Sequence, residues 1–237
     1  MFGRHQAARN AMPVAAWLFL CAAMVMAMMV IGAITRLTES GLSMVEWRPL
    51  IGALPPLGEA EWNRVFALYR ETSQYRLANS GMDLSAFQTI FWWEYIHRLW
   101  GRLIGLVFAL PFIFFAIRGM VPRGMRGHLV VLFVLGGAQG LIGWWMVKSG
   151  FVERTDVSQY RLAVHLGLAF VILGYLLWLA LDIVAPGRRV ACRRAPGHPR
   201  GLAMAAPGLV FLAALARGLC AGRDVGAALP DPALDRL

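Results

Sequence analysis

Long apolar blocks alternate with polar stretches along this 237-residue chain. Four blocks, at residues 14–34, 94–117, 129–147 and 162–185, are long enough to cross a bilayer as helices, which takes about 20 residues each. The first block exceeds the roughly 7–15 apolar residues of a signal-peptide core, so we interpret it as a retained span. The pattern predicts an all-α, polytopic membrane protein with a four-helix transmembrane bundle.

The segments between and after these blocks differ in character. Residues 35–88 mix apolar and charged positions at near-helical spacing, and we expect one or two interfacial helices there. After residue 185 the pattern weakens: residues 202–216 are a candidate for an incomplete fifth span, and an aberrant or disordered tail is expected beyond them. We therefore divide the chain into a transmembrane domain, residues 1–185, and a basic loop with its tail, residues 186–237.

Composition and charge support this reading. Apolar residues make up 59% of the chain and charged residues 15%, which excludes an ordinary water-soluble enzyme or a disordered protein. The net charge is +10, and the excess arginines lie in residues 1–13, 118–128 and 186–200, whereas the other loops are mixed in charge. Short basic loops remain on the cytoplasmic side of a membrane, so we expect a cytoplasmic N-terminus. This distribution is typical of membrane orientation and does not indicate nucleic-acid binding.

Ionisable side chains within two spans mark the candidate site, because charged groups in a membrane are costly. At 100° per residue, Glu94, His97, Arg98 and Arg102 share one face of the second span. His165 lies in the fourth span, and both histidines come four residues past the predicted outer interface, about 6 Å deep. Two imidazoles at matched depth on different helices suit axial ligation of a haem. The remaining histidines lie in segments predicted to be cytoplasmic and are expected to be solvated: His5, His128 and His198.

Each candidate residue has a second interpretation. The two histidines could hydrogen-bond to neighbouring helices without binding a metal. Glu94 could orient the His97 imidazole or act as a reactive carboxylate beside a haem edge. Arg98 and Arg102 could bind haem propionates or pair with Glu94. Gln139 shares one face of the third span with glycines, which leave room for a macrocycle or, more simply, allow close helix packing.

Four blocks of the sequence resemble the haem A synthase family, in the form found in proteobacteria and mitochondria. They are GAITRLTESGLSMVEWRP at 32–49, EYIHR at 94–98, QGLIGWWMVKSG at 139–150 and YRLAVH at 160–165, in the order found in the family. The resemblance covers residues 14–185. It implies oxidation of the C8 methyl group of haem O to a formyl group, with water as the oxygen source, to give haem A for cytochrome c oxidase.

The resemblance also implies roles for individual residues. His97 and His165 would ligate the haem iron, and Glu94 would be the catalytic carboxylate that stabilises charge or accepts a proton. Arg98, Arg102 and Gln139 are the further cofactor-binding candidates. The main alternative is a bis-histidine b-type membrane cytochrome that transfers electrons without transforming a substrate. A transporter is disfavoured, because its polar residues would extend through the full depth of the bilayer.

The family architecture has two four-helix halves, each with a histidine pair. We therefore expect this chain to be a C-terminally truncated, incomplete form, in which the second-half haem b site is missing or a homo-oligomer of halves replaces it. Expected partners are haem O as substrate, haem O synthase and cytochrome c oxidase assembly factors. The expected location is the bacterial inner membrane, with the haem site near the periplasmic side.

Overall fold

The computed structural model describes residues 2–46, 54–122, 124–148, 150 and 157–185, with the backbone alone for residues 2–10. All its elements are helices: α1 (Phe2–Leu37), η1 (Ser40–Leu42), α2 (Glu59–Arg70), α3 (Ser73–Leu77), α4 (Leu84–Ile117), α5 (Arg126–Lys148) and α6 (Gln159–Val184). Among the described residues, α1, α4, α5 and α6 contain stretches long and apolar enough to cross a membrane. The predicted all-α, polytopic fold class is confirmed. The candidate fifth span and the tail lie outside the described residues.

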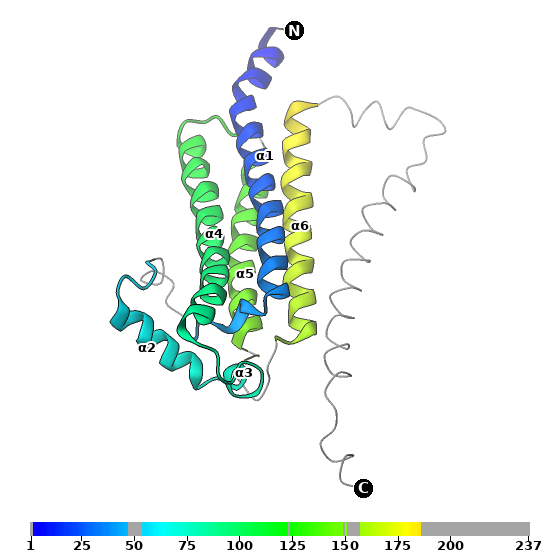
Figure 1. Cartoon of the computed structure of the whole chain (residues 1–237). Helices are drawn as coiled ribbons and strands as arrows, with labels where there is room; N and C mark the ends of the chain where they lie inside the picture. The colour runs from blue at the N-terminus through cyan, green and yellow to red at the C-terminus, as the bar shows by residue number, and fades with distance from the viewer. Residues whose placement is uncertain (1, 47–53, 123, 149, 151–156, 186–237) are drawn as a thin grey trace.

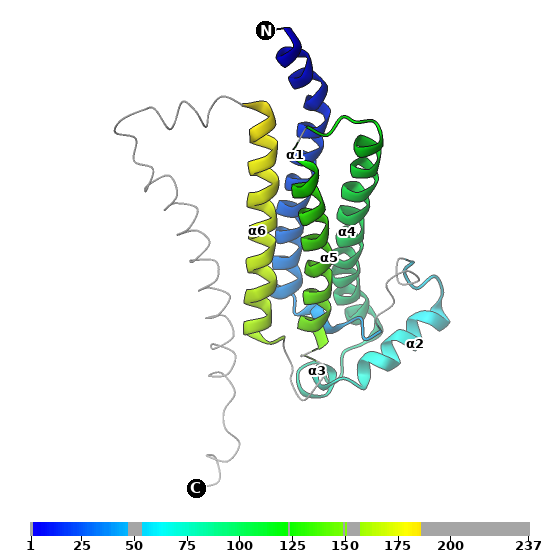
Figure 2. The same ribbon diagram turned by 180° about the vertical axis from the view of Figure 1, so that it is seen from behind.

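The four long helices lie side by side and alternate in direction (Figures 1 and 2). Helix α1 packs against α4 and α6, and α5 packs against α6 and α4, so α4 and α6 stand across the bundle from one another. The helices η1, α2 and α3 gather at one end, where α1 ends and α4 begins. We call this the capped end of the bundle and the other the open end.

Helix α4 begins at Leu84 rather than at residue 94, where the apolar block suggested a start. Asp83 is its N-cap: the carboxylate accepts hydrogen bonds from the backbone N–H of Ala86 at 2.8 Å and from a neighbouring serine hydroxyl. The additional turns bury Phe87 and Phe91 against the aromatic side chains of α2. Helices α2 and α3 lie within residues 35–88, and their position at a membrane interface stays a prediction.

Packing differs along the bundle. Toward the open end, side chains from all four long helices form one core, in which Leu18, Leu129, Leu176 and Leu179 are at most 2% exposed. Toward the capped end the same helices contribute residues 26–34, 96–107, 133–148 and 159–171, and none of these described residues is fully buried. Protein interiors are normally close-packed. The capped half of the bundle is therefore loosely filled, and it contains the candidate histidines.

Candidate functional site

The two candidate ligands come from helices that face each other across the bundle, His97 from α4 and His165 from α6. Both side chains are half-buried. Each lies against a glycine of an adjacent helix: a Cβ atom added to Gly32 of α1 would lie 3.4 Å from His97 Nε2, and one added to Gly143 of α5 would lie 3.0 Å from His165 Cε1. The rings thus occupy space that a side chain would otherwise fill.

These two glycines also place the histidines at one level. Gly32 is five residues before the end of α1 at Leu37, and Gly143 is five residues before the end of α5 at Lys148. Both helices end at the capped end, so each glycine is about 7 Å from it at 1.5 Å per residue. The two imidazoles therefore lie at similar distances from the ends of α1 and α5, and their matched depth in a membrane stays a prediction. That they bind iron stays a prediction at this point.

The surroundings of His165 contain polar atoms without a partner. Gln139 of α5 donates a hydrogen bond from Nε2 to the backbone oxygen of His165 at 3.0 Å, and the same nitrogen lies 3.5 Å from the ring Nε2. His165 Nδ1 and Gln139 Oε1 are buried and make no hydrogen bond within the described residues. A buried polar atom without a partner costs about 1–3 kcal/mol. A metal or a polar ligand group bound here would offset that cost.

Glu94 is only 2% exposed, and none of its hydrogen bonds goes to either histidine. Its Oε2 atom accepts hydrogen bonds from Ser43 Oγ and from the backbone N–H of Met44, both at 2.7 Å, and its Oε1 atom is paired with Arg98. His97 is not among its hydrogen-bond partners. The carboxylate is therefore held by the segment that follows η1, and it does not orient the His97 ring through a hydrogen bond.

Arg98 takes the second of its two predicted roles, that of partner to Glu94. Its guanidinium also donates to the backbone oxygens of Met44 at 2.9 Å and Glu46 at 3.4 Å, which ties residues 43–46 to α4. Arg102 lies one turn further along α4 and is half-buried. Its proposed contact with a haem propionate stays a prediction.

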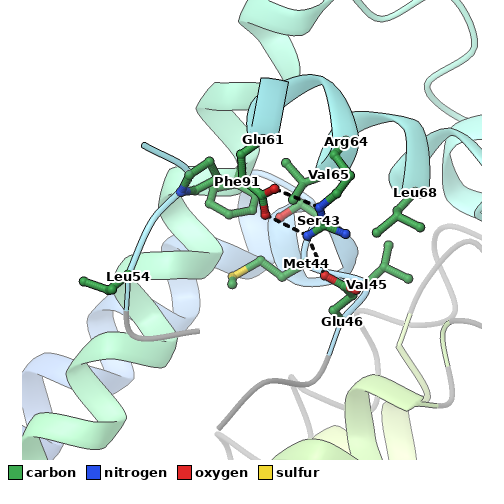
Figure 3. Close-up of a pocket in the computed structure, with 11 residues that line it drawn as sticks. Ser43, Met44, Val45, Glu46, Leu54, Glu61, Arg64, Val65, Leu68 and Phe91 are labelled. Atoms are coloured by element: carbon green, nitrogen blue, oxygen red, sulfur yellow. Dashed lines mark hydrogen bonds and ion pairs between the residues drawn. The ribbon is translucent and has the colours of Figure 1, made fainter. Parts of the chain in front are cut away.

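A pocket of about 140 Å³ lies on the other side of residues 43–46, beneath α2 (Figure 3). Its apolar wall includes Val65 and Phe91. At its rim Arg64 bridges two carboxylates, with Nη2 at 2.8 Å from both Glu46 and Glu61. The hydrogen bonds that the Arg64 guanidinium donates to Glu61 and Glu46 raise its pKa above the ordinary value. The sequence alone did not predict this pocket, because residues 43–46, residues 54–68 and Phe91 of α4 come together only in the folded chain.

The described residues contain no group of three or more His, Cys, Asp or Glu side chains that could hold a metal ion alone. A haem needs fewer protein ligands, because the macrocycle supplies four nitrogens and the protein only the axial positions. The two imidazoles on opposed helices and the glycines against them, in the half of the bundle where no residue of the four ranges above is fully buried, fit such a group.

A third histidine departs from its prediction. His128, expected to be solvated, is half-buried near the open end, with Nδ1 2.6 Å from the Tyr175 hydroxyl and its ring edge-on to Tyr175 and Trp178. It joins α5 to α6, well away from the other two histidines along both helices. His5 and His198 lie where no side chain is described.

Sequence comparisons give consistent matches. The model of a family described as "Cytochrome oxidase assembly protein" matches residues 15–235, beyond the residue 185 at which the motif resemblance ended. Heme A synthase of Caulobacter sp. (strain K31) is 51% identical over 214 residues, 90% of this chain and 62% of the relative. Heme A synthase of Rhodospirillum centenum is 51% identical over 224 residues, 94% of this chain and 59% of the relative.

A third relative, heme A synthase of Parvibaculum lavamentivorans, is 57% identical over 171 residues, 72% of this chain and 50% of the relative. The chain thus spans between 50% and 62% of the length of these three curated relatives. No solved structure matches the chain.

Proposed function

This chain belongs to the cytochrome oxidase assembly protein family, and from this premise we propose that it binds haem O between His97 and His165 and oxidises its C8 methyl group to a formyl group, giving haem A. Three relatives with 51–57% identity are named heme A synthase. The observation that carries the proposal is the pair of half-buried imidazoles on opposed helices, each against a glycine, in the loosely filled half of the bundle.

The residues around the histidines would hold the substrate. His97 and His165 would hold the haem iron, and Gln139 fixes the backbone of His165 through a hydrogen bond. Arg102, half-buried one turn beyond Arg98, provides a cation for a propionate. Arg98 would pair with Glu94 and not with a propionate, because its guanidinium donates hydrogen bonds to that carboxylate and to the backbone oxygens of Met44 and Glu46.

Glu94 would act on the reacting methyl group. Water supplies the oxygen of the formyl group, electrons pass to an external acceptor, and Glu94 accepts protons or stabilises the positive charge that develops on the substrate. A positioned carboxylate of this kind contributes about 10²–10⁴-fold to rate. Its position is well defined, since two donors and a guanidinium hold it.

The chain is a membrane protein, with four helices long and apolar enough to span a bilayer. We propose that these helices cross the bacterial inner membrane with the N-terminus in the cytoplasm and the capped end at the periplasmic side, as the arginine distribution predicts. Haem O synthase would supply the substrate, and the product would pass to cytochrome c oxidase assembly.

Haem extraction tests the proposal. The chain is expressed in a host that makes haem O and lacks its own haem A synthase, and the haems bound to the purified protein are separated by chromatography. We expect haem O and haem A with the wild type, little haem with His97→Ala or His165→Ala, and haem O with at least about 10²-fold less haem A with Glu94→Gln. His128→Ala is the matched control and should behave as wild type.

Two outcomes would contradict the proposal. A wild-type chain without haem would remove both haem-based functions. A wild-type chain that binds haem O and forms no oxidised product would favour the b-type cytochrome.

A further inference from the structure

The Glu94 carboxylate needs a path for any proton that it accepts, because residues 43–46 separate it from the outside. Of its three hydrogen-bond donors, the Met44 backbone N–H and the Arg98 guanidinium can only donate, and a guanidinium does not lose its proton in proteins. The Ser43 hydroxyl both donates and accepts. It is therefore the one group of the three that can take a proton from Glu94 and release another.

Ser43 also borders the pocket beneath α2. The residue is only 1% exposed, so Ser43 belongs to the floor of the pocket rather than to its mouth. A volume of about 140 Å³ is large enough for several water molecules. Ser43 thus donates to a buried carboxylate 2.7 Å away and also lines a space that water can fill.

The mouth of the pocket is polar and reaches solvent. The Glu46, Glu61 and Arg64 side chains are 35%, 43% and 39% exposed. Two carboxylates at the mouth can accept protons from pocket water and pass them outward, while Arg64 holds the two together. Figure 3 shows Arg64 joined by dashed lines to Glu61 and to Glu46, beside Ser43 and Met44.

We propose that Ser43 and this pocket form the route by which protons leave Glu94. In each transfer the Glu94 carboxyl gives its proton to Ser43 Oγ while the hydroxyl proton of Ser43 passes to a water in the pocket. Glu94 returns to the carboxylate, Ser43 keeps one proton, and no electron moves. The route rests on the proposed function, in which Glu94 accepts protons from the substrate.

The simpler role for Ser43 is structural, since its hydrogen bond helps to hold Glu94. Threonine and valine at position 43 have the same shape and only threonine has a hydroxyl, so the pair isolates the effect of the hydroxyl. The rate of Glu94 protonation and the solvent isotope effect then separate proton transfer from the hold on Glu94, because a hydrogen bond that only holds the carboxylate would change neither. Any strain from the added methyl groups is common to both variants. Alanine is less informative, because a water molecule could occupy the vacated space and replace the hydroxyl.

The first measurement follows proton arrival at Glu94 in the full chain without haem. The infrared carboxylate band that Glu94→Gln removes is recorded after a rapid drop in pH. In the Ser43→Thr variant we expect Glu94 to be protonated at close to the wild-type rate. In the Ser43→Val variant we expect Glu94 to be protonated about tenfold or more slowly. Ser40→Ala is the matched control. Ser40 is buried in η1, just before residues 43–46, and contacts Thr38, not Glu94. The rate at which Glu94 is protonated should therefore be unchanged.

The second measurement is haem A formation at equal haem O content. Ser43→Val should form haem A more slowly than Ser43→Thr and show a larger solvent deuterium isotope effect. Equal protonation rates and equal isotope effects in the two variants would overturn the route. If Ser43→Val then still formed haem A more slowly, the hydroxyl would only hold Glu94 in place. Failure of the proposed function appears separately, as a wild type that makes no haem A, and the infrared rates still test the route in that case.

Discussion

Toward the open end of the bundle, α1 and α6 contribute side chains such as Leu18 and Leu179, which are 0% and 1% exposed, to a single core. Toward the capped end the same two helices carry Gly32 and His165, and no residue between 159 and 171 of α6 is fully buried. Each helix therefore serves two purposes along its length. In the proposed function the capped half holds the flat haem and the open half supplies the packing, so the bundle needs no separate domain for its ligand.

The division has an energetic basis. Burial of an aliphatic side chain stabilises by about 1.5–3 kcal/mol, and in lipid the closeness of packing itself drives helix association. The capped half has less of this stabilisation, because its side chains are less buried. It also holds buried polar atoms, such as His165 Nδ1, that have no hydrogen-bond partner among the described residues. Stability should therefore depend mainly on the open half, and ligand binding on the capped half.

The largest effect that tests this division is expected from Leu18→Ala in the open half. Removing a fully buried leucine should lower the free energy of unfolding by about 2–5 kcal/mol, measured by denaturant titration in detergent. Leu20→Ala on the same helix is the control, since Leu20 is 53% exposed and should change stability little. The division is wrong if the folded Leu18→Ala chain binds haem much more weakly than the wild type.

The next effect concerns the capped half. In Gly143→Ala the new methyl group would lie 3.0 Å from His165 Cε1 and must displace the imidazole. We expect about tenfold weaker haem binding, equivalent to ~1.4 kcal/mol, with stability in the absence of haem nearly unchanged. Gly140→Ala is the control, because nothing lies within 4 Å of its added Cβ. Equal haem affinities in a spectroscopic titration would show that the glycine is not needed behind the ring.

The smallest effect lies outside the bundle, at the start of α4. Hydrogen bonds from the Ala86 N–H and the Ser85 hydroxyl hold the pKa of Asp83 below its ordinary value. A carboxyl with a lowered pKa stabilises the fold above its unfolded-state pKa, and this contribution disappears as the pH falls through the folded-state pKa. Asp83→Ala should therefore lower the melting temperature at neutral pH, and the gap to the wild type should narrow on acidification.

Asp83→Asn separates the cap from its charge, because asparagine caps helices about as well as aspartate. It should keep most of the stability at neutral pH and lose the acid dependence that belongs to this residue. A gap between Asp83→Ala and the wild type that stays constant from neutral to acidic pH would contradict the assignment.

The sequence predicted the spans because length and apolarity alone decide them. It did not predict that α4 begins at Leu84, since the first turns are amphipathic and become buried only under α2. It placed Glu94 and Arg98 on one face, and the spacing of four residues is the signal that favours their pairing.

Other partners of Glu94 had no local signal. Ser43 and Met44 are 51 and 50 residues away in the chain, and their contact with Glu94 depends on how the segment after α1 folds back over α4. The pocket beneath α2 escaped prediction for the same reason. Sequence periodicity describes one helix at a time, whereas these contacts belong to the assembled capped end.

The pairing of Glu94 with Arg98 has a consequence for how the chain is built into a membrane. Both residues lie on α4, four residues apart, so the carboxylate and the guanidinium can neutralise each other before any other helix packs against α4. An isolated charge in a bilayer is costly. Helix α4 can therefore enter the lipid with this ion pair already formed. Ser43 and Met44 then add their hydrogen bonds to a carboxylate whose charge is already neutralised within the same helix.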